Sequence, residues 1–159
     1  MVKLVGAAIV ILGATLYGMK KYSDISMRKK FLEELFDDAA KIKNSLQCAC
    51  LPLHECFLSG GEFFKTAASK IKTGELPSQA IEDSLQAYPI LKIRDKECLR
   101  RFANGLGAGD CNGQIANLDI FINDVGKILK EAEDELNIKG KLYIKGSILS
   151  AAAIVLLLI

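Results

Sequence analysis

The chain has 159 residues, of which 50% are hydrophobic and 25% are charged, and its formal net charge is +2 at pH 7. This length allows one modest domain and excludes a large multidomain enzyme. The charges are unevenly distributed, because every acidic residue lies between Asp24 and Glu135. The two acid-free ends contain long apolar runs, so we expect the ends and the middle of the chain to face different solvents.

The N-terminal run from Leu4 to Met19 contains no charged residue. These 16 residues would form a helix about 24 Å long, and the flanking Lys3 and Lys20 would extend it toward a hydrocarbon core of about 30 Å. We therefore predict a transmembrane helix over residues 1–21. The alternative is a cleavable signal peptide. No Ala-x-Ala site follows the run, and the basic cluster behind it opposes export.

The C-terminal segment, residues 142–159, is predicted to be a second transmembrane helix of about 27 Å. Small residues stand one turn apart in both predicted spans, a spacing that allows close packing in lipid. The same composition also suits an anchor that packs against nothing. The small residues are Ala14 and Gly18 in the first span, and Gly146 with Ser150 and Ser147 with Ala151 in the second.

The distribution of basic residues predicts the topology. Lysines and arginines follow the first span and precede the second, and only Lys3 lies beyond them, so the middle should stay in the cytoplasm beneath the cell membrane. An odd number of cysteines fits the same reducing compartment. We interpret all five as small buried apolar side chains. They are Cys48, Cys50, Cys56, Cys98 and Cys111.

The middle, residues 22–141, is predicted to be an all-α helical bundle. Apolar residues recur at spacings of three and four, whereas period-two alternation and hairpin signals are absent. The first predicted helix begins after the possible N-caps Ser23 and Asp24 and buries Phe31, Leu32, Leu35, Phe36, Ala39, Ile42 and Leu46. The others cover about 52–74, strained at Gly60-Gly61, then 77–88, 95–104 and 111–138.

Composition argues against several functions of this domain. From Asp24 to Glu135 there are 15 basic and 19 acidic residues, a net charge of −4, which disfavours nucleic-acid binding. The chain has one histidine and no tryptophan, and it contains no nucleophile motif. We therefore expect no enzymatic activity, no catalytic residues, no small-molecule substrate, no cofactor and no metal.

Two motifs are expected to meet at one end of the domain. The first and last predicted helices of the middle are each about 40 Å long. If they run side by side, the segment with Pro52, His54 and Glu55 reaches the same level as the loop Gly105–Asp110. In that loop Asp110 could serve as N-cap of the following helix, a reading favoured over a phosphate-binding loop because no strand precedes it.

A different function is suggested by a group of possible metal ligands. Cys48, Cys50, His54 and Cys56 lie within nine residues, which would suit a membrane-tethered metal or redox sensor. The group lacks the usual C-x2-C spacing, and Pro52 divides it between two helices, so buried thiols are the favoured interpretation. A further alternative is a purely structural scaffold that only oligomerises.

Two motifs in this sequence resemble stage III sporulation protein AB of endospore-forming bacteria. They are Pro52-Leu53-His54-Glu55-Cys56-Phe57, and Gly105-Leu106-Gly107-Ala108-Gly109-Asp110 followed by Gln114 and Leu118. The resemblance extends along the whole chain. Two departures are local: Ala49-Cys50-Leu51 replaces the usual glycine-leucine-threonine, and Gly109 replaces the usual serine.

The resemblance implies a role that the residue pattern alone does not give. It implies a sporulation membrane protein of the channel between mother cell and forespore, in the mother-cell or outer forespore membrane. It also implies a domain similar to type II secretion and type IV pilus platform proteins. The expected partners are a secretion-type ATPase similar to stage III sporulation protein AA, other channel membrane proteins and further copies of the chain. Pro52, His54, Glu55, Gly105, Gly107, Asp110 and Gln114 are the predicted partner interface.

Overall fold

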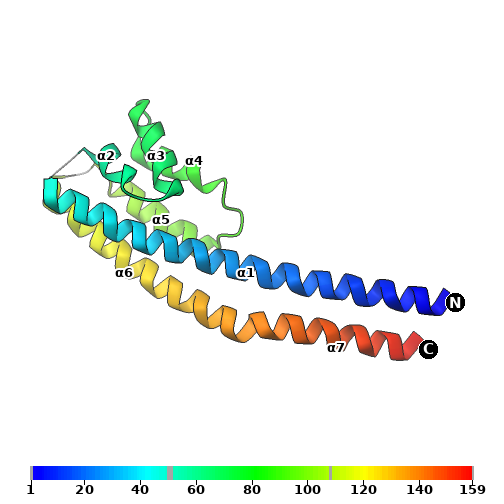
Figure 1. Ribbon diagram of the computed structural model, residues 1–159. Helices are drawn as coiled ribbons and strands as arrows, with labels where there is room; N and C mark the ends of the chain where they lie inside the picture. The colour runs from blue at the N-terminus through cyan, green and yellow to red at the C-terminus, as the bar shows by residue number, and fades with distance from the viewer. Residues whose placement is uncertain (1, 50–51, 108, 159) are drawn as a thin grey trace. The chain divides into compact units, whose positions relative to one another are not determined.

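The computed structural model describes residues 2–49, 52–107 and 109–158, and these ranges are helical with no strand (Figure 1). The all-α prediction is confirmed. The chain divides into two compact units. Unit 1 comprises Met1–Lys29 with Glu131–Ile159, and unit 2 comprises Lys30–Lys130. The domain limits predicted from the sequence, 1–21, 22–141 and 142–159, remain a prediction.

Helix α1 covers Val2–Ala49 without interruption. The predicted helix start at Ser23 and Asp24 is therefore wrong. No glycine or proline occurs between Met19 and Ala49, so nothing in this stretch interrupts the hydrogen bonds between successive turns. A potential N-cap begins a helix only where the preceding backbone is not already helical.

The core of unit 2 is built on one face of α1. Six of the seven side chains predicted for this face are buried, and Phe36 is half-buried. Leu32, Ala39 and Ile42 are at most 1% exposed. The helical spacing of apolar residues therefore predicted the buried face correctly.

The segment after Pro52 forms two helices, α2 (Leu53–Leu58) and α3 (Glu62–Lys72), rather than the single strained helix predicted from the sequence. The break falls at Gly60-Gly61. The backbone N–H of Gly61 donates to Oδ2 of Asp38 on α1 at 2.7 Å, outside the intrahelical pattern. A Cβ on Gly60 would lie 3.2 Å from Cδ1 of Ile42. The double glycine therefore lets the α2–α3 connection approach α1 closely.

Helices α4 (Pro77–Leu85) and α5 (Ile93–Asn104) follow α3 and lie near the positions predicted from the sequence. Helix α5 begins two residues earlier than predicted, because the Asp95 side chain accepts a hydrogen bond from the Lys92 backbone N–H at 2.9 Å. Asp95 is consequently a first-turn residue rather than the start of the helix. Phenylalanines from α2, α3 and α5 pack edge to face at the centre: Phe57, Phe63, Phe64 and Phe102.

Helix α6 (Cys111–Glu135) continues through a π-helical turn, η1 (Leu136–Gly140), into α7 (Lys141–Leu158). Gly140 faces Tyr22 of α1, and a Cβ at this position would lie 3.0 Å from Cδ2 of the tyrosine. The irregular turn therefore lies at a close contact within unit 1.

Among the residues that the structure describes, no helix combines the length and the apolar character needed to cross a membrane. The transmembrane helices predicted for 1–21 and 142–159 are therefore not confirmed. The uncharged run of α1 ends at Lys20 after 16 residues, and Lys145 lies within α7. Each charged residue shortens the continuous apolar segment that could lie in the hydrocarbon core of a bilayer.

Candidate functional site

The two helices of unit 1 pack through small residues. In this unit the first part of α1 and α7 run side by side (Figure 1). Gly18 lies against α7, where an added Cβ would be 3.0 Å from the Tyr143 carbonyl oxygen and would collide with Oγ of Ser147. Ala14, Gly146 and Ser150 line a cavity of about 270 Å³ beside this contact. The side chain of Ala151 lies outside the described residues.

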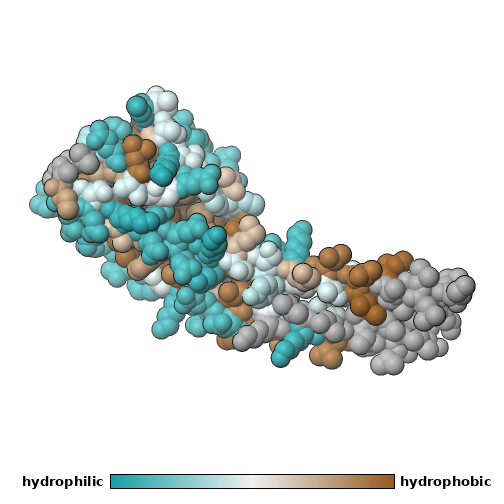
Figure 2. Space-filling view, in the orientation of Figure 1, coloured by the Kyte–Doolittle hydropathy of each residue, from teal (hydrophilic) through white to brown (hydrophobic). Residues whose placement is uncertain are grey.

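Unit 1 also exposes many large apolar side chains, and these form brown areas on its surface (Figure 2). Ile9, Leu12 and Leu16 on α1 are 63 to 66% exposed, and Leu142 and Leu149 on α7 are about 70% exposed. Exposed apolar area of this extent is typical of a surface that meets a partner or a membrane.

In unit 2 the two motifs meet at one cavity of about 190 Å³, which we name the motif cavity. Leu53 comes from the first motif, and the second motif supplies its glycine-rich loop and the start of α6. Leu46 of α1 completes the wall. The seven lining residues are Leu46, Leu53, Gly107, Gly109, Asp110, Cys111 and Gln114.

The first motif begins helix α2. The Pro52 carbonyl accepts hydrogen bonds from the N–H groups of Glu55 at 2.9 Å and Cys56 at 3.1 Å, so Pro52 serves as N-cap. Pro52 and Glu55 are exposed, and His54 is half-buried. Nε2 of His54 lies 3.9 Å from Oε1 of Glu55, so an imidazole and a carboxylate lie next to each other on this surface.

The loop of the second motif needs glycine at two positions. Gly107 and Gly109 have φ values of +77° and +125°, a region that other residues enter only with strain. Asp110 then caps α6, because its Oδ1 accepts a hydrogen bond from the Gly113 N–H at 2.9 Å. The predicted N-cap role of Asp110 is thus confirmed.

Two amide side chains of α6 hold the end of α5 in place. Nδ2 of Asn117 donates to the Phe102 carbonyl at 3.0 Å, and Nε2 of Gln114 donates to the Gly105 carbonyl at 3.4 Å. Both carbonyls lie at the C-terminal end of α5, where the helix has no further backbone N–H groups to donate to its last carbonyls. Gly105 has a second role, since a Cβ there would lie 2.6 Å from Oδ1 of Asn117.

Gln114 leaves one polar atom without a partner. The residue is 9% exposed, and its buried Oε1 accepts no hydrogen bond from the residues that the structure describes. Because the Gly105 carbonyl can only accept, the amide nitrogen must face it, and Oε1 is the buried atom that is left over. Gln114 is therefore a buried member of the predicted interface with a side-chain oxygen that the described residues leave without a hydrogen bond.

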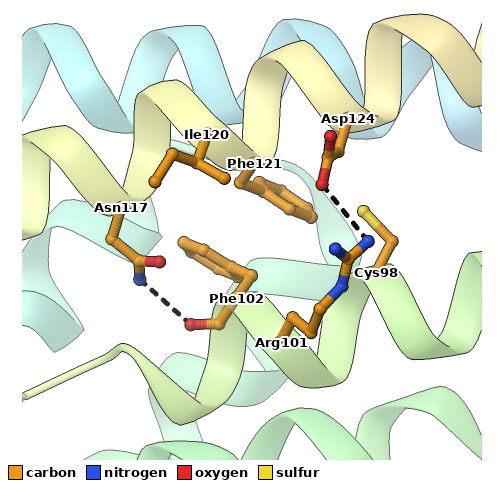
Figure 3. Close-up of a pocket in the computed structure, with 7 residues that line it drawn as sticks. All are labelled: Cys98, Arg101, Phe102, Asn117, Ile120, Phe121 and Asp124. Carbon is orange, nitrogen blue, oxygen red and sulfur yellow. Dashed lines mark hydrogen bonds and ion pairs between the residues drawn. The ribbon is translucent and has the colours of Figure 1, made fainter.

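A second, smaller cavity of about 80 Å³ lies between α5 and α6 (Figure 3). The rings of Phe102 and Phe121 stack with their centroids 4.2 Å apart, and an ion pair of 3.2 Å joins Arg101 to Asp124. Burial, together with the Asp124 carboxylate, raises the pKa of the Cys98 thiol to about 11. This thiol stays neutral at physiological pH and packs as an apolar group.

The sequence analysis did not single out Asn117 or Asp38, and it named Leu46 only as a core residue. Asn117 follows Gln114 by three residues, so both side chains lie on the same face of α6. A polar pair at this spacing next to a helix end could have indicated that the two side chains bind the end of α5. Asp38 adjoins a similar residue, Asp37, and no local pattern distinguishes the buried carboxylate from the exposed one.

The metal-ligand hypothesis gains no support from geometry. Within the described ranges, no group of three or more histidine, cysteine or acidic side chains is placed to hold a metal ion. Cys48 is exposed at the end of α1, so the interpretation of all five cysteines as buried is wrong. Cys56 is buried in α2, and Cys50 lies outside the described residues.

Comparison with known families gives the identification. The family model described as stage III sporulation protein AB matches residues 3–159. The chain belongs to the stage III sporulation protein AB family. The match covers both motifs and both ends of the chain, so the resemblance seen in the sequence is confirmed. No curated protein and no solved structure matches the chain.

Membership of the stage III sporulation protein AB family supports a role in sporulation. In this member the two motifs that carried the resemblance line one cavity of unit 2, although 47 residues separate them.

Proposed function

We propose that this sporulation protein is a platform that couples a cytoplasmic secretion-type ATPase to a membrane assembly of the channel between mother cell and forespore. The observation that supports this proposal is the meeting of the two motifs at the motif cavity. Leu53 of one motif and Gly107, Gly109 and Asp110 of the other line the same space. Residues so far apart in sequence would serve one contact surface.

The surface around the motif cavity suits reversible docking of a protein. His54, Glu55 and Asp110 have no role in the core, and all three are exposed or half-buried. The capping bonds of Pro52 and Asp110 fix the backbone that carries them, so little ordering would be required on binding. A rigid polar surface with a small cavity fits contact with another folded protein.

The membrane end of the platform would be unit 1. Its exposed apolar side chains on α1 and α7 would enter lipid, and its flanking lysines would remain at the headgroups. We place the protein in the mother-cell or outer forespore membrane with unit 2 in the cytoplasm. Whether the ends cross the bilayer or lie shallowly in it can be tested with cysteines introduced at Val2 and Leu158.

The docking role can be tested with full-length protein in detergent micelles and the purified ATPase. The variant combines His54→Ala, Glu55→Ala and Asp110→Ala. The control combines Asp37→Ala and Glu97→Ala, which remove two exposed acids elsewhere on unit 2. We expect at least roughly tenfold weaker ATPase binding for the first variant, because removing even one residue that carries much of the binding energy of an interface costs above about 1 kcal/mol.

Equal binding by both variants and the natural protein would reject the docking role. Self-association without any ATPase binding would instead favour the purely structural scaffold.

A further inference from the structure

An open groove lies between α1 and α7 in unit 1. Ala14 and Tyr17 of α1 line one side, and the face of α7 from Leu142 to Ser150 lines the other. We name it the unit 1 groove. Its volume is about 270 Å³, and the part of α7 between Leu142 and Ser150 is about 12 Å long. The proposed docking role of unit 2 makes no use of this space.

Gly146 leaves room in the middle of the groove. A Cβ added at Gly146 would meet no heavy atom within 4 Å, whereas one added at Gly18 would collide with Oγ of Ser147. The helices therefore pack closely at Gly18 and leave an open space beside Gly146. The groove is several times larger than the roughly 30 Å³ that one water occupies, so it can hold a chain of several atoms.

The surroundings of the groove are apolar. Leu142, in its lining, is 69% exposed, and Leu149, next to Ser150, is 70% exposed. Exposed apolar side chains form brown areas on this unit in Figure 2. Because transfer of such a surface out of water is favourable, we expect an occupant of the groove to carry an apolar part.

Positive charge lies at one end of the groove. Nζ of Lys21 lies 5.9 Å from the centroid of the Tyr17 ring, which lines the groove. Residues 1–23 and 136–159 together contain six lysines and no acidic residue, so Asp24 is the nearest acid to Lys21 along α1. We therefore expect the occupant to carry an anion as well, at the end of the groove near Tyr17.

An anionic phospholipid has both parts in one molecule. Its acyl chain can lie between the helices beside Gly146, and its phosphate can reach the ammonium group of Lys21, with the Tyr17 hydroxyl at the level of the headgroup. A second copy of the chain fits less well. Its matching segments would bring six more lysines and no acidic residue to the groove, so the two surfaces would repel each other.

We infer that the unit 1 groove binds one molecule of an anionic phospholipid, with Lys21 at the phosphate and an acyl chain beside Gly146. The inference deepens the proposed function, and it rests on that function only in placing unit 1 in lipid. A lipid held in this way would fix the membrane end of the platform at the headgroup level.

The test uses the full-length protein in detergent micelles without any ATPase, and native mass spectrometry counts the bound lipids. The probes are dioleoylphosphatidylglycerol, dioleoylphosphatidylcholine and glycerol 3-phosphate. The second probe has acyl chains without a net charge, and the third has the anion without acyl chains. We expect one saturable phosphatidylglycerol adduct, at least roughly fivefold weaker binding of phosphatidylcholine, and no binding of glycerol 3-phosphate.

The first pair of variants tests the charge. Lys21→Gln should weaken phosphatidylglycerol binding roughly fivefold, because it removes the ammonium group nearest the groove. Its control, Lys145→Gln, removes the same charge from an exposed position of α7 that does not line the groove. The control should bind phosphatidylglycerol as the natural protein does, since salt screens exposed charges that lie apart from the site.

The second pair tests the space for the acyl chain. Gly146→Leu should abolish the saturable adduct, because the new side chain fills the groove. Its control, Gly6→Leu, adds the same apolar side chain at an exposed position of α1, where an added Cβ also meets no heavy atom within 4 Å. This control should leave lipid binding unchanged.

Equal binding of the two lipids would overturn the inference, as would a series of adducts that does not saturate at one lipid. Equal weakening by Lys21→Gln and Lys145→Gln would also overturn it, because the charge would then act over the whole unit. If Gly146→Leu fails to fold, the lysine variants decide the matter alone. Failure here leaves the docking role to its own binding assay, and failure of that assay leaves the lipid site standing.

Discussion

Arg28 and Glu135 form a largely buried ion pair in unit 1, with 3.1 Å between Nη1 of the arginine and Oε2 of the glutamate. Their side chains are only 7% and 15% exposed. The pair joins α1 to the last residue of α6, immediately before the π-helical turn. Its position indicates that it holds the two helices of unit 1 in register.

Removing one member of this pair should destabilise the protein. We expect Arg28→Met to lower the free energy of unfolding by about 1–3 kcal/mol, because Glu135 loses its buried cationic partner and keeps the exposed Lys139, whose Nζ lies 3.3 Å from its Oε1. Lys29→Met is the control, since the Lys29–Glu133 pair is 3.9 Å long and more exposed; its loss should cost below about 1 kcal/mol. Urea unfolding in micelles, followed by circular dichroism, measures both, and equal losses would contradict a special role for Arg28.

Asp38 should be more important than its neighbour Asp37. Its carboxylate accepts hydrogen bonds from the Gly61 N–H at 2.7 Å and from Nζ of Lys41 at 2.9 Å, and it is 7% exposed. We expect Asp38→Ala to cost about 1–2 kcal/mol, because the N–H that precedes α3 loses its acceptor. Asp37→Ala, at an exposed position, should change unfolding by at most about 0.5 kcal/mol. Similar costs for the two variants would show that the Asp38 contacts do not stabilise the fold.

Gly105 should tolerate a side chain only when Asn117 is shortened. Its φ of −84° suits any residue, so the effect of Gly105→Ala comes from the collision with the Asn117 amide. We expect a loss of about 1–3 kcal/mol, as for overpacking elsewhere. The double variant Gly105→Ala with Asn117→Ala should be no less stable than Asn117→Ala alone. Strict additivity in this double-mutant cycle would argue against the clash.

Cys98 and Cys48 should differ sharply in reactivity toward iodoacetamide. Cys98 is 3% exposed and its pKa is raised to about 11 by burial, whereas Cys48 is exposed. Because the thiolate is the reacting species, Cys98 should be alkylated only when the protein unfolds. Mass spectrometry after limited labelling at neutral pH measures both sites. Labelling of Cys98 as fast as Cys48 under native conditions would show that the thiol is accessible.

The same thiol predicts a loss of stability in alkali. The pKa of Cys98 is about 11 in the folded chain against an ordinary value of 9.0, so folding favours the neutral form. The stabilisation is complete below about pH 9 and is lost as the pH rises toward 11, to a limit of about 3 kcal/mol. Other groups titrate in this range, so the measured quantity is the difference in unfolding free energy between the natural protein and Cys98→Ala. A difference that stays constant from about pH 8 to 11 would contradict the prediction.

The sequence determined the helical character of the chain and the buried face of α1, because the spacing of Phe31, Leu35, Ile42 and their neighbours follows the helical repeat directly. It also determined the cap at Asp110 and the family, since both depend on short motifs that can be read locally. The same local reading placed a helix start at Ser23 and a single helix across Gly60-Gly61, and both placements were wrong.

Only the tertiary structure decided which polar groups form hydrogen bonds within the fold and which do not. Asp38 differs from Asp37 because one side chain meets the Gly61 N–H and the other meets solvent. Gln114 is left with an unpartnered Oε1 because the end of α5 takes up only its amide nitrogen. Such pairings join residues that are distant in sequence, and their energies depend on burial and distance, which no local pattern of residues specifies.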